Sequence, residues 1–221
     1  MQHSVVLFIL SVSAASGFLL ETSNRNVTKI LKVTNGGQFG YWSNPQFCPP
    51  GTFASGFSMK IESNQFTGDD TALNAIRLTC SDDSGHAQLG YQITSGEGPF
   101  GSWSKTETCN QQFHASNFLV GFALQVEAPQ GAGDDTSANY VKFFCRDFDG
   151  NNAETELNRP PGHGNFGNWG EWSDSCDKDS AICGLNTKVE SQQGGGDDTG
   201  LNDAIFYCCN DDSGSGFPVG K

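Results

Sequence analysis

The chain has 221 residues, of which 25 are Asp or Glu and 12 are Lys or Arg, so its formal net charge is −13. An acidic chain repels phosphate backbones and anionic lipid headgroups, and no local cluster of Lys or Arg offsets the charge here. Nucleic acids and membrane surfaces are therefore excluded as expected partners. Hydrophobic residues make up 36% and charged residues 17% of the chain, which predicts a folded domain.

The first segment, residues 1–16, is expected to be a signal peptide. An apolar run over residues 5–10 is followed by the small residues of positions 13–16, which is typical of a cleaved secretion signal. We therefore expect a secreted, extracellular protein whose mature chain opens with a leader, residues 17–33. Asn26 lies in an Asn-Val-Thr sequon of this leader and is the expected glycosylation site.

The remainder of the chain is organised by internal repetition. The signature Gly-Asp-Asp-Thr begins at Gly68, Gly133 and Gly196. A Gly, a Glu, an Asn and a Cys keep constant spacing to it in every copy: Gly56, Gly121, Gly184; Glu62, Glu127, Glu190; Asn74, Asn139, Asn202; Cys80, Cys145, Cys208. At looser spacing each copy opens with an aromatic segment that contains Trp42, Trp103 or Trp172. This pattern predicts one domain over residues 34–212, with copies at about 34–96, 97–160 and 161–212, and a tail over 213–221.

Each copy is β in character. Phe57, Met59 and Ile61 alternate with polar residues at period two, and residues 122–126 repeat the pattern. After the Asp-Asp-Thr turn a second alternating segment follows, so each copy predicts an antiparallel hairpin. A single small sheet leaves one face uncovered, so we expect three sheets around a shared core with approximate threefold symmetry.

These residues resemble the vitelline membrane outer layer protein I family, and the resemblance covers about residues 34–212. It implies an all-β fold, a β-prism of three Greek-key antiparallel sheets with pseudo-threefold symmetry, together with four disulfides and secretion. It also implies a structural or glycan-associating role in an extracellular coat such as the egg's outer vitelline layer. The third copy departs from the pattern with Leu185 in place of Phe and with an insert over residues 151–167.

The partners expected from the resemblance are extracellular glycans or coat glycoproteins, and we expect a monomer without a cofactor. A β-prism lectin of the jacalin type is the first alternative, although no motif of this sequence resembles those proteins. A transferase acting on N-acetylglucosamine oligomers is the second alternative. A glycan array distinguishes coat component from lectin, because only a lectin gives saturable binding of a discrete ligand.

The eight cysteines are expected to form four disulfides, because an even number in a secreted chain is normally paired. Equivalence of the copies predicts one bridge in each: Cys48–Cys80, Cys109–Cys145 and Cys176–Cys208. Cys183 and Cys209 then pair by elimination. The swapped pairing in the third copy stays open, because the residues after Cys209 match those after Cys80 better than the residues after Cys208 do.

The adjacent aspartates of the three signatures are candidate glycan-binding residues: Asp69, Asp70, Asp134, Asp135, Asp197 and Asp198. Glycosyl transfer uses two carboxylates on opposite sides of the glycosidic bond. The carboxylates of two adjacent aspartates in a turn instead point apart or accept hydrogen bonds from nearby backbone amides. A structural loop is the favoured interpretation, an acidic sugar-binding surface the next, and catalysis the last. No catalytic residue is identified. The repeated Glu is expected on an ordinary outer face, and the repeated Asn is expected to be buried and bonded to the preceding loop.

Trp42, Trp103 and Trp172 could stack on sugar rings, but symmetry-repeated tryptophans more often fill a core, and that interpretation is favoured. No metal site is expected. The histidines are scattered, no Cys-x-x-Cys occurs, and residues 147–151 match only a fragment of a calcium loop.

Overall fold

The computed structural model describes residues 25–63, 71–82, 87–109, 117–128, 136–158, 166–192 and 199–211, and only the backbone of residues 87–90. The expected signal peptide and the tail lie outside these ranges. The described strands are β1 (Val27–Leu31), β2 (Tyr41–Trp42), β3 (Gln46–Phe47), β4 (Phe53–Ile61), β5 (Leu73–Ser81), β6 (Ala87–Thr94), β7 (Ser102–Trp103), β8 (Glu107–Thr108), β9 (Asn117–Val126), β10 (Ala138–Asp147), β11 (Thr155–Leu157), β12 (Asn168–Trp169), β13 (Ser180–Val189) and β14 (Leu201–Asn210). Within the described ranges, no helix is long and apolar enough to cross a membrane.

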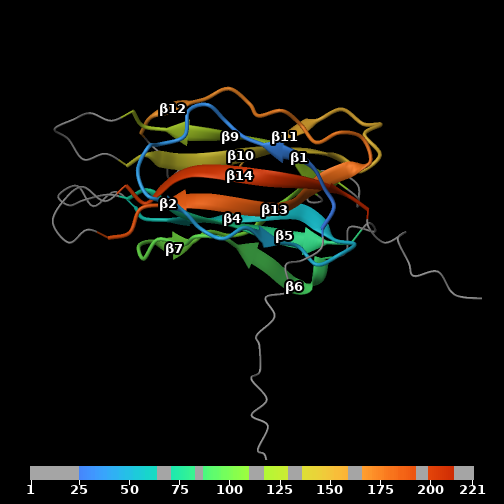
Figure 1. The fold of residues 1–221 in the computed structure, drawn as a ribbon, viewed down its shortest axis with the longest axis horizontal. Helices are drawn as coiled ribbons and strands as arrows, with labels where there is room; N and C mark the ends of the chain where they lie inside the picture. The colour runs from blue at the N-terminus through green and yellow to red at the C-terminus, as the bar shows by residue number, and fades with distance from the viewer. Residues whose placement is uncertain are drawn as a thin grey trace, which may run out of the picture.

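The strands form three antiparallel sheets. Sheet A has the order β1-β14-β13-β2, sheet B the order β6-β5-β4-β7, and sheet C the order β11-β10-β9-β12, while β3 also pairs with β13 and β8 with β4. In Figure 1 sheet C lies above, sheet A across the middle and sheet B below, with the strands of all three close to horizontal. In sheets B and C a fourth strand returns beside the first of three consecutive strands, which is a Greek key. The predicted β-prism is confirmed.

Each sheet is built on one long hairpin of the kind that the alternation predicts: β4–β5, β9–β10 and β13–β14. In β4 the predicted apolar face is buried, with Phe57, Met59 and Ile61 at most 6% exposed. The hydrophobic residues of the three hairpins therefore meet in a common core between the sheets.

Four phenylalanines form the centre of that core. Phe143 of sheet C lies with its ring centroid 4.8 Å from that of Phe57 in sheet B and 5.2 Å from that of Phe206 in sheet A. Phe122 lies 4.6 Å from Phe206, and all four side chains are at most 1% exposed. Leu185, which replaces Phe in the third copy, is also fully buried. One contiguous core joins the three sheets, since rings from each contact rings from the others.

The aromatic opening of each copy pairs with the sheet of another copy. Strands β7 and β8 precede β9 in the chain but pair with β4 of sheet B, and β12 precedes β13 but pairs with β9 of sheet C. Strands β2 and β3 precede β4 and pair with β13 of sheet A, which closes the ring. No copy completes its own sheet, so the three copies stabilise one another by a cyclic exchange of edge strands.

Sheet A also contains both ends of the described chain. Strand β1 pairs with β14, so the Greek key of this sheet consists of β13, β14, β1 and β2. In this sheet β14, at the C-terminal end of the described chain, lies beside β1, at its N-terminal end. Strand β1 lies within residues 17–33, which the sequence assigned to a leader. The described sheet structure therefore begins at Val27, seven positions before the expected boundary at residue 34.

The repeated Gly of the central strands lies where an exchanged strand crosses closest. A Cβ at Gly56 would lie 2.5 Å from the carbonyl oxygen of Glu107 in β8, and a Cβ at Gly184 would lie 2.4 Å from the Phe47 ring in β3. Because any side chain at these positions would collide with the exchanged strand, glycine is required there.

All four predicted disulfides are present: Cys48–Cys80, Cys109–Cys145, Cys176–Cys208 and Cys183–Cys209. The alternative that exchanges partners in the third copy is wrong. Each of the first three bridges ties the segment after an aromatic opening to the hairpin of its own copy, so it links two sheets. The exchange is thereby fixed covalently in all three copies.

The fourth disulfide replaces a hydrogen bond found at the equivalent place in sheet B. Cys183 follows the residue that pairs with Cys208, just as Ser55 follows the residue that pairs with Cys80. On the opposite strands, Cys209 follows Cys208 and Ser81 follows Cys80. Cys183 is bonded to Cys209, and in sheet B the hydroxyl oxygens of Ser55 and Ser81 lie 2.5 Å apart in a buried hydrogen bond. The same contact is therefore covalent in one sheet and polar in another.

Candidate functional site

Each sheet carries the same triad of Glu, Thr and Asn at the loop end of its central hairpin, where the first strand ends and the second begins. In sheet B the Thr71 hydroxyl donates to Glu62 Oε2 at 2.7 Å, and Asn74 Nδ2 donates to Thr71 Oγ1 at 2.6 Å. The same bonds, at 2.5 to 2.7 Å, join Glu127, Thr136 and Asn139 in sheet C and Glu190, Thr199 and Asn202 in sheet A. The prediction of a buried Asn bonded to the loop is confirmed. The Glu, which the sequence assigned to an ordinary outer face, instead closes the loop, and its constant spacing of nine residues to the Thr was the available signal.

The three triads meet around the pseudo-threefold axis but are not equivalent in detail. The carbonyl oxygen of the Asn202 side chain accepts from the Ser137 hydroxyl at 2.9 Å and from the Phe39 amide at 3.2 Å. Asn139 Oδ1 accepts from the Phe166 amide at 3.4 Å. Asn74 Oδ1 is buried and has no hydrogen-bond partner among the described residues. At this end of the prism the hydrogen bond from Ser137 to Asn202 joins sheet C directly to sheet A.

The six candidate aspartates lie outside the described residues. They are Asp69, Asp70, Asp134, Asp135, Asp197 and Asp198. Each pair directly precedes the Thr of a triad in the chain. Their role in loop structure, glycan binding or catalysis stays a prediction.

Trp42 and Trp103 occupy equivalent positions, but their counterpart in the third copy is Trp169. Trp42 pairs with Lys188 of β13 and Trp103 with Lys60 of β4. The equivalent position of β9 pairs with Trp169, whereas Trp172 lies beyond strand β12. The correct register was available as a Phe-Gly-x-Trp motif, found at residues 39–42, 100–103 and 166–169. In all three copies its Gly has a positive φ of 74 to 80°.

The tryptophans lie on the outside of the prism, so the core interpretation is wrong. Trp42 is 42% and Trp169 41% exposed, and Trp103 and Trp172 are half-buried. Trp172 stacks on Phe144 with ring centroids 3.6 Å apart. The physical reason is the strand exchange, since the aromatic openings form the edges of sheets and not the layer between them.

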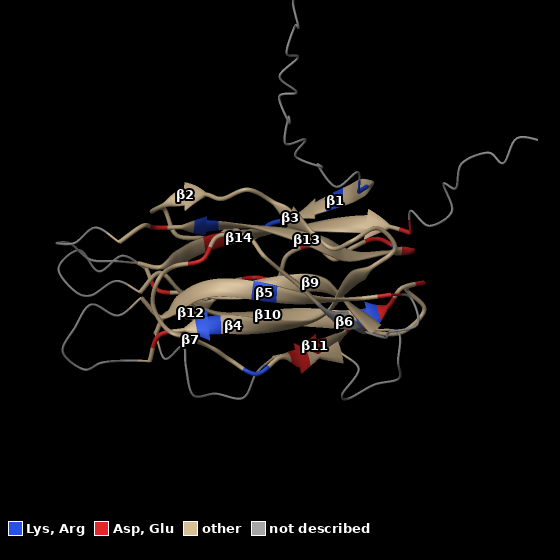
Figure 2. Cartoon of the chain, turned by 90° about the horizontal axis from the view of Figure 1, so that it is seen from below, with Lys and Arg blue, Asp and Glu red and all other residues tan. Residues whose placement is uncertain are grey.

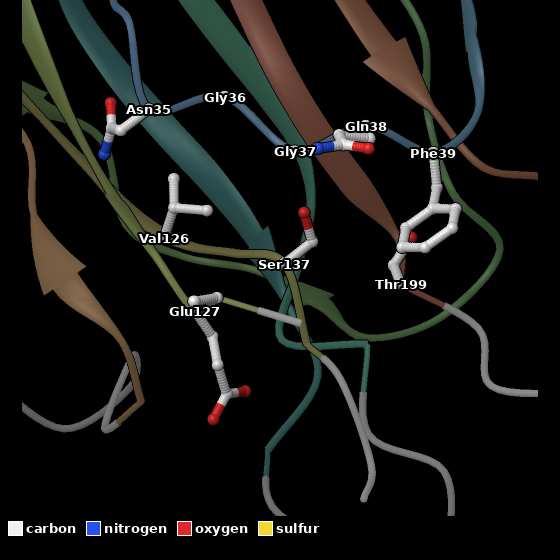
Figure 3. A pocket seen from close by; sticks show the side chains of 10 residues that line it. Asn35, Gly36, Gly37, Gln38, Phe39, Val126, Glu127, Ser137 and Thr199 are labelled. Atoms are coloured by element: carbon white, nitrogen blue, oxygen red, sulfur yellow. The ribbon is translucent and has the colours of Figure 1, made fainter. Parts of the chain in front are cut away.

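Two clefts of the same construction lie between neighbouring sheets. Each is bounded by the glycine-rich loop before a Phe-Gly-x-Trp motif and by the end of the central strand that carries the triad Glu. The A/C cleft, about 180 Å³, is lined by residues 35–39 and 126–128 together with Ser137 and Thr199. Figure 3 shows Val126 and Ser137 directed toward the loop and the Glu127 carboxylate directed away from it.

The second cleft, the A/B cleft, is larger, at about 310 Å³. It is lined by residues 41–43, 97–99 and 189–192. Tyr41 is 85% exposed, and Trp42 lies beside it in β2. The carboxylate of Glu97 accepts a 2.8 Å hydrogen bond from Lys60, so this cleft combines exposed aromatic rings with polar groups. Such a combination is typical of sites that bind small polar ligands.

Among the described residues, Lys and Arg are interspersed with Asp and Glu. Figure 2 shows blue and red segments interspersed along the strands and at their ends. One carboxyl is perturbed: burial raises the pKa of Asp203, opposed by a hydrogen bond from the Ala204 amide and by Lys188 and Lys32. Among the described residues no group of three His, Cys, Asp or Glu could hold a metal ion. In the calcium-loop fragment, Asp147 uses its carboxylate to accept from the amides of Asn151 and Asn152.

Comparison with known proteins identifies the relatives of this chain. The family model described as vitelline membrane outer layer protein I matches residues 29–211. The human protein named vitelline membrane outer layer protein 1 homolog is 43% identical over 210 residues, which cover 92% of this chain and 95% of the human one. Its mouse namesake is 46% identical over 182 residues, which cover 81% of this chain and 83% of the mouse protein.

Among solved structures, recombinant single-chain jacalin matches at a TM-score of 0.47 and 10% identity, with 86% of this chain and 99% of that chain covered. A mannose-specific jacalin-related lectin from Morus nigra, solved with mannose, matches at a TM-score of 0.45 and 15% identity over the same shares. With the family model covering the described prism and two relatives above 40% identity, the chain belongs to the vitelline membrane outer layer protein I family.

Proposed function

We propose that this chain is a secreted component of an extracellular coat and that it associates with glycans of that coat. Family membership supports the coat role, because the human and mouse relatives carry the vitelline membrane name. Four buried disulfides support an oxidising, extracellular environment.

The observation that carries the glycan association is the outward position of the aromatic openings. Trp42 and Trp169 keep about two fifths of their surface exposed, and Tyr41 keeps most of it. Burial of these rings is not needed to hold the sheets together, because the phenylalanine core does that. Exposed aromatic rings beside hydrogen-bonding groups are suited to a ligand with an apolar face and a polar rim, and a sugar ring is such a ligand.

Coat adhesion of the full-length secreted chain tests this function. We expect the fluorescently labelled protein to adhere to isolated egg-coat material, and enzymatic removal of the coat glycans to abolish most of the adhesion. Adhesion that survives complete deglycosylation would refute the glycan association, and absence of adhesion would refute the coat role. A glycan array run in parallel distinguishes the lectin alternative, which requires saturable binding of a discrete oligosaccharide.

A further inference from the structure

The three equivalent tryptophans differ in what covers their outer faces. The Arg77 guanidinium lies 3.6 Å from the centroid of the Trp103 ring in sheet B. In sheet C, Lys142 Nζ lies 4.6 Å from the Trp169 ring and also forms a salt bridge with Glu156. A cation held over the ring competes with any ligand that would stack there.

The covering cation occupies the same position of the fold in both sheets, and sheet A lacks it. In sheet B, Trp103 pairs with Lys60 of β4, and Arg77 pairs with Ser58, two positions earlier on the same strand. In sheet C, Trp169 pairs with Gln125 of β9, and Lys142 pairs with Ala123, again two positions earlier. In sheet A the residue at this position is Ile205, which pairs with Asn186, two positions before the partner of Trp42. An aliphatic side chain of this length carries no charge and cannot cover the ring as Arg77 does. Among the described residues, no ring or cation contact to Trp42 is found.

The open ring faces the larger of the two clefts. Trp42 lines the A/B cleft together with Tyr41, residues 97–99 and the polar residues Ser191 and Gln192. The cleft volume of about 310 Å³ suits one or two sugar rings, near the lower end of the usual range for small-molecule sites. Both acidic residues that line the cleft already have partners, since Glu97 accepts from Lys60 and Glu190 accepts from the Thr199 hydroxyl.

We propose that the A/B cleft is the single glycan subsite of the prism, with Trp42 as its stacking platform and neutral oligosaccharides of equatorially substituted pyranoses as its ligands. The C–H face of such a ring is apolar and packs on the indole, while its rim hydroxyls reach the polar groups of the cleft. The net charge of −13 disfavours sulfated and sialylated glycans. The subsite rests on the proposed function, and Trp42 is distinguished from the equally exposed Trp169 by having no cation over its ring among the described residues.

Titration of the full-length secreted protein with tri-N-acetylchitotriose, followed by calorimetry, tests the subsite. We expect binding at one site per chain in the wild type. Trp42→Ala should weaken it at least roughly tenfold, in line with the loss of one stacked ring. Trp103→Ala is the matched control, because this ring is covered by Arg77, and its affinity should stay within roughly twofold of the wild type.

A second variant leaves Trp42 in place. Ile205→Arg introduces in sheet A the cation that covers the tryptophan in sheet B, at a half-buried outer position, and should weaken binding as strongly as Trp42→Ala does. Unchanged thermal unfolding confirms that the fold is intact. A 6-O-sulfated form of the same trisaccharide should bind at least roughly tenfold more weakly than the neutral one to the wild type.

The outcomes separate the subsite from the proposed function. Saturable binding that persists in both Trp42→Ala and Ile205→Arg overturns the subsite but leaves glycan association intact. Equal weakening in Trp103→Ala overturns it as well, because the covered ring then contributes as much as the open one. If the wild type binds neither the trisaccharide nor deglycosylation-sensitive coat material, the proposed function fails.

Discussion

Replacement of the Cys183–Cys209 disulfide by two serines should lower the free energy of unfolding by an amount that follows from the loop that the bridge closes. Cys183–Cys209 closes a sequence separation of 26 residues, but the neighbouring Cys176–Cys208 bridge already ties the segment before β13 to β14. With that neighbour intact, the shortest covalent loop that the fourth bridge closes contains roughly nine residues, for which the chain-entropy relation gives about 2.6 kcal/mol. Cys48–Cys80 closes a loop of 32 residues without a neighbouring bridge. The same relation gives about 3.7 kcal/mol for its removal.

The chemistry of the replacement then matters, because sheet B contains a serine pair at the equivalent place. The Ser55 and Ser81 hydroxyls are hydrogen-bonded and buried. A Cys183→Ser/Cys209→Ser double variant should form the same bond and regain about 1 kcal/mol relative to the double alanine variant. Urea unfolding under oxidising conditions should therefore give a loss of about 1.5 to 2 kcal/mol for the serine pair and about 2.6 kcal/mol for the alanine pair.

Two results would refute this reasoning. A serine pair that destabilises as much as the alanine pair means that the two sheets are not equivalent at this contact. A fourth bridge whose removal costs more than removal of Cys48–Cys80 means that loop closure is not the dominant contribution of these disulfides.

The remaining predictions concern the triads, a glycine and a carboxyl. Asn202→Ala should destabilise by about 3 kcal/mol and Asn74→Ala by about 1 kcal/mol, measured by urea unfolding, because only Asn202 also accepts from Ser137 and from a backbone amide; equal losses would contradict this. Gly101→Ala should cost several times more than Gly51→Ala, since both have a positive φ but only at Gly101 would a Cβ meet backbone atoms, at 2.4 Å; similar melting temperatures for the two variants would be the contrary result. For Asp203 the folded-state pKa is raised above 3.8, so its contribution to stability is present at pH below 3.8 and is lost as pH rises through the folded pKa. Asp203→Asn should therefore gain in melting temperature over the wild type as pH rises through that range, and a difference that does not change with pH would exclude the titration of Asp203 as its cause.

The hairpins, the disulfides and the buried asparagines could be predicted from the sequence because each depends on local pattern or on equivalence of the copies. Alternation at period two gives the buried face of β4, and constant spacing identifies Cys48 with Cys80 and Asn74 with its loop. In each case the residues that interact belong to the same copy. The information is then contained within about 60 residues and is repeated three times.

The strand exchange could not be predicted in this way. Strands such as β2 and β12 are two residues long, and an alternation of two residues carries no information about which sheet accepts it. In sheets A and B the pairing also needs a glycine on another copy's central strand, because a Cβ at Gly56 or Gly184 would collide with the exchanged strand. The tryptophan of the third copy was misplaced because the sequence match was made on the segment Gly170-Glu171-Trp172-Ser173, whereas the structural register follows the positive-φ Gly167, two residues before Trp169.

The differences between the copies carry the functional information, because the shared residues are required by the fold. The Glu, Thr and Asn triad and one disulfide recur in every copy, and the close approach of an exchanged strand to a central glycine recurs in sheets A and B. Arg77, Lys142 and Ile205 occupy one equivalent position of the three sheets and differ in charge. If a cation lay over all three tryptophan rings, no ring would be available for stacking, and if none were covered, all three would be available. In the subsite proposed above, the aliphatic Ile205 leaves the Trp42 ring without a covering cation, so this position selects which of the three equivalent tryptophans serves as the stacking platform.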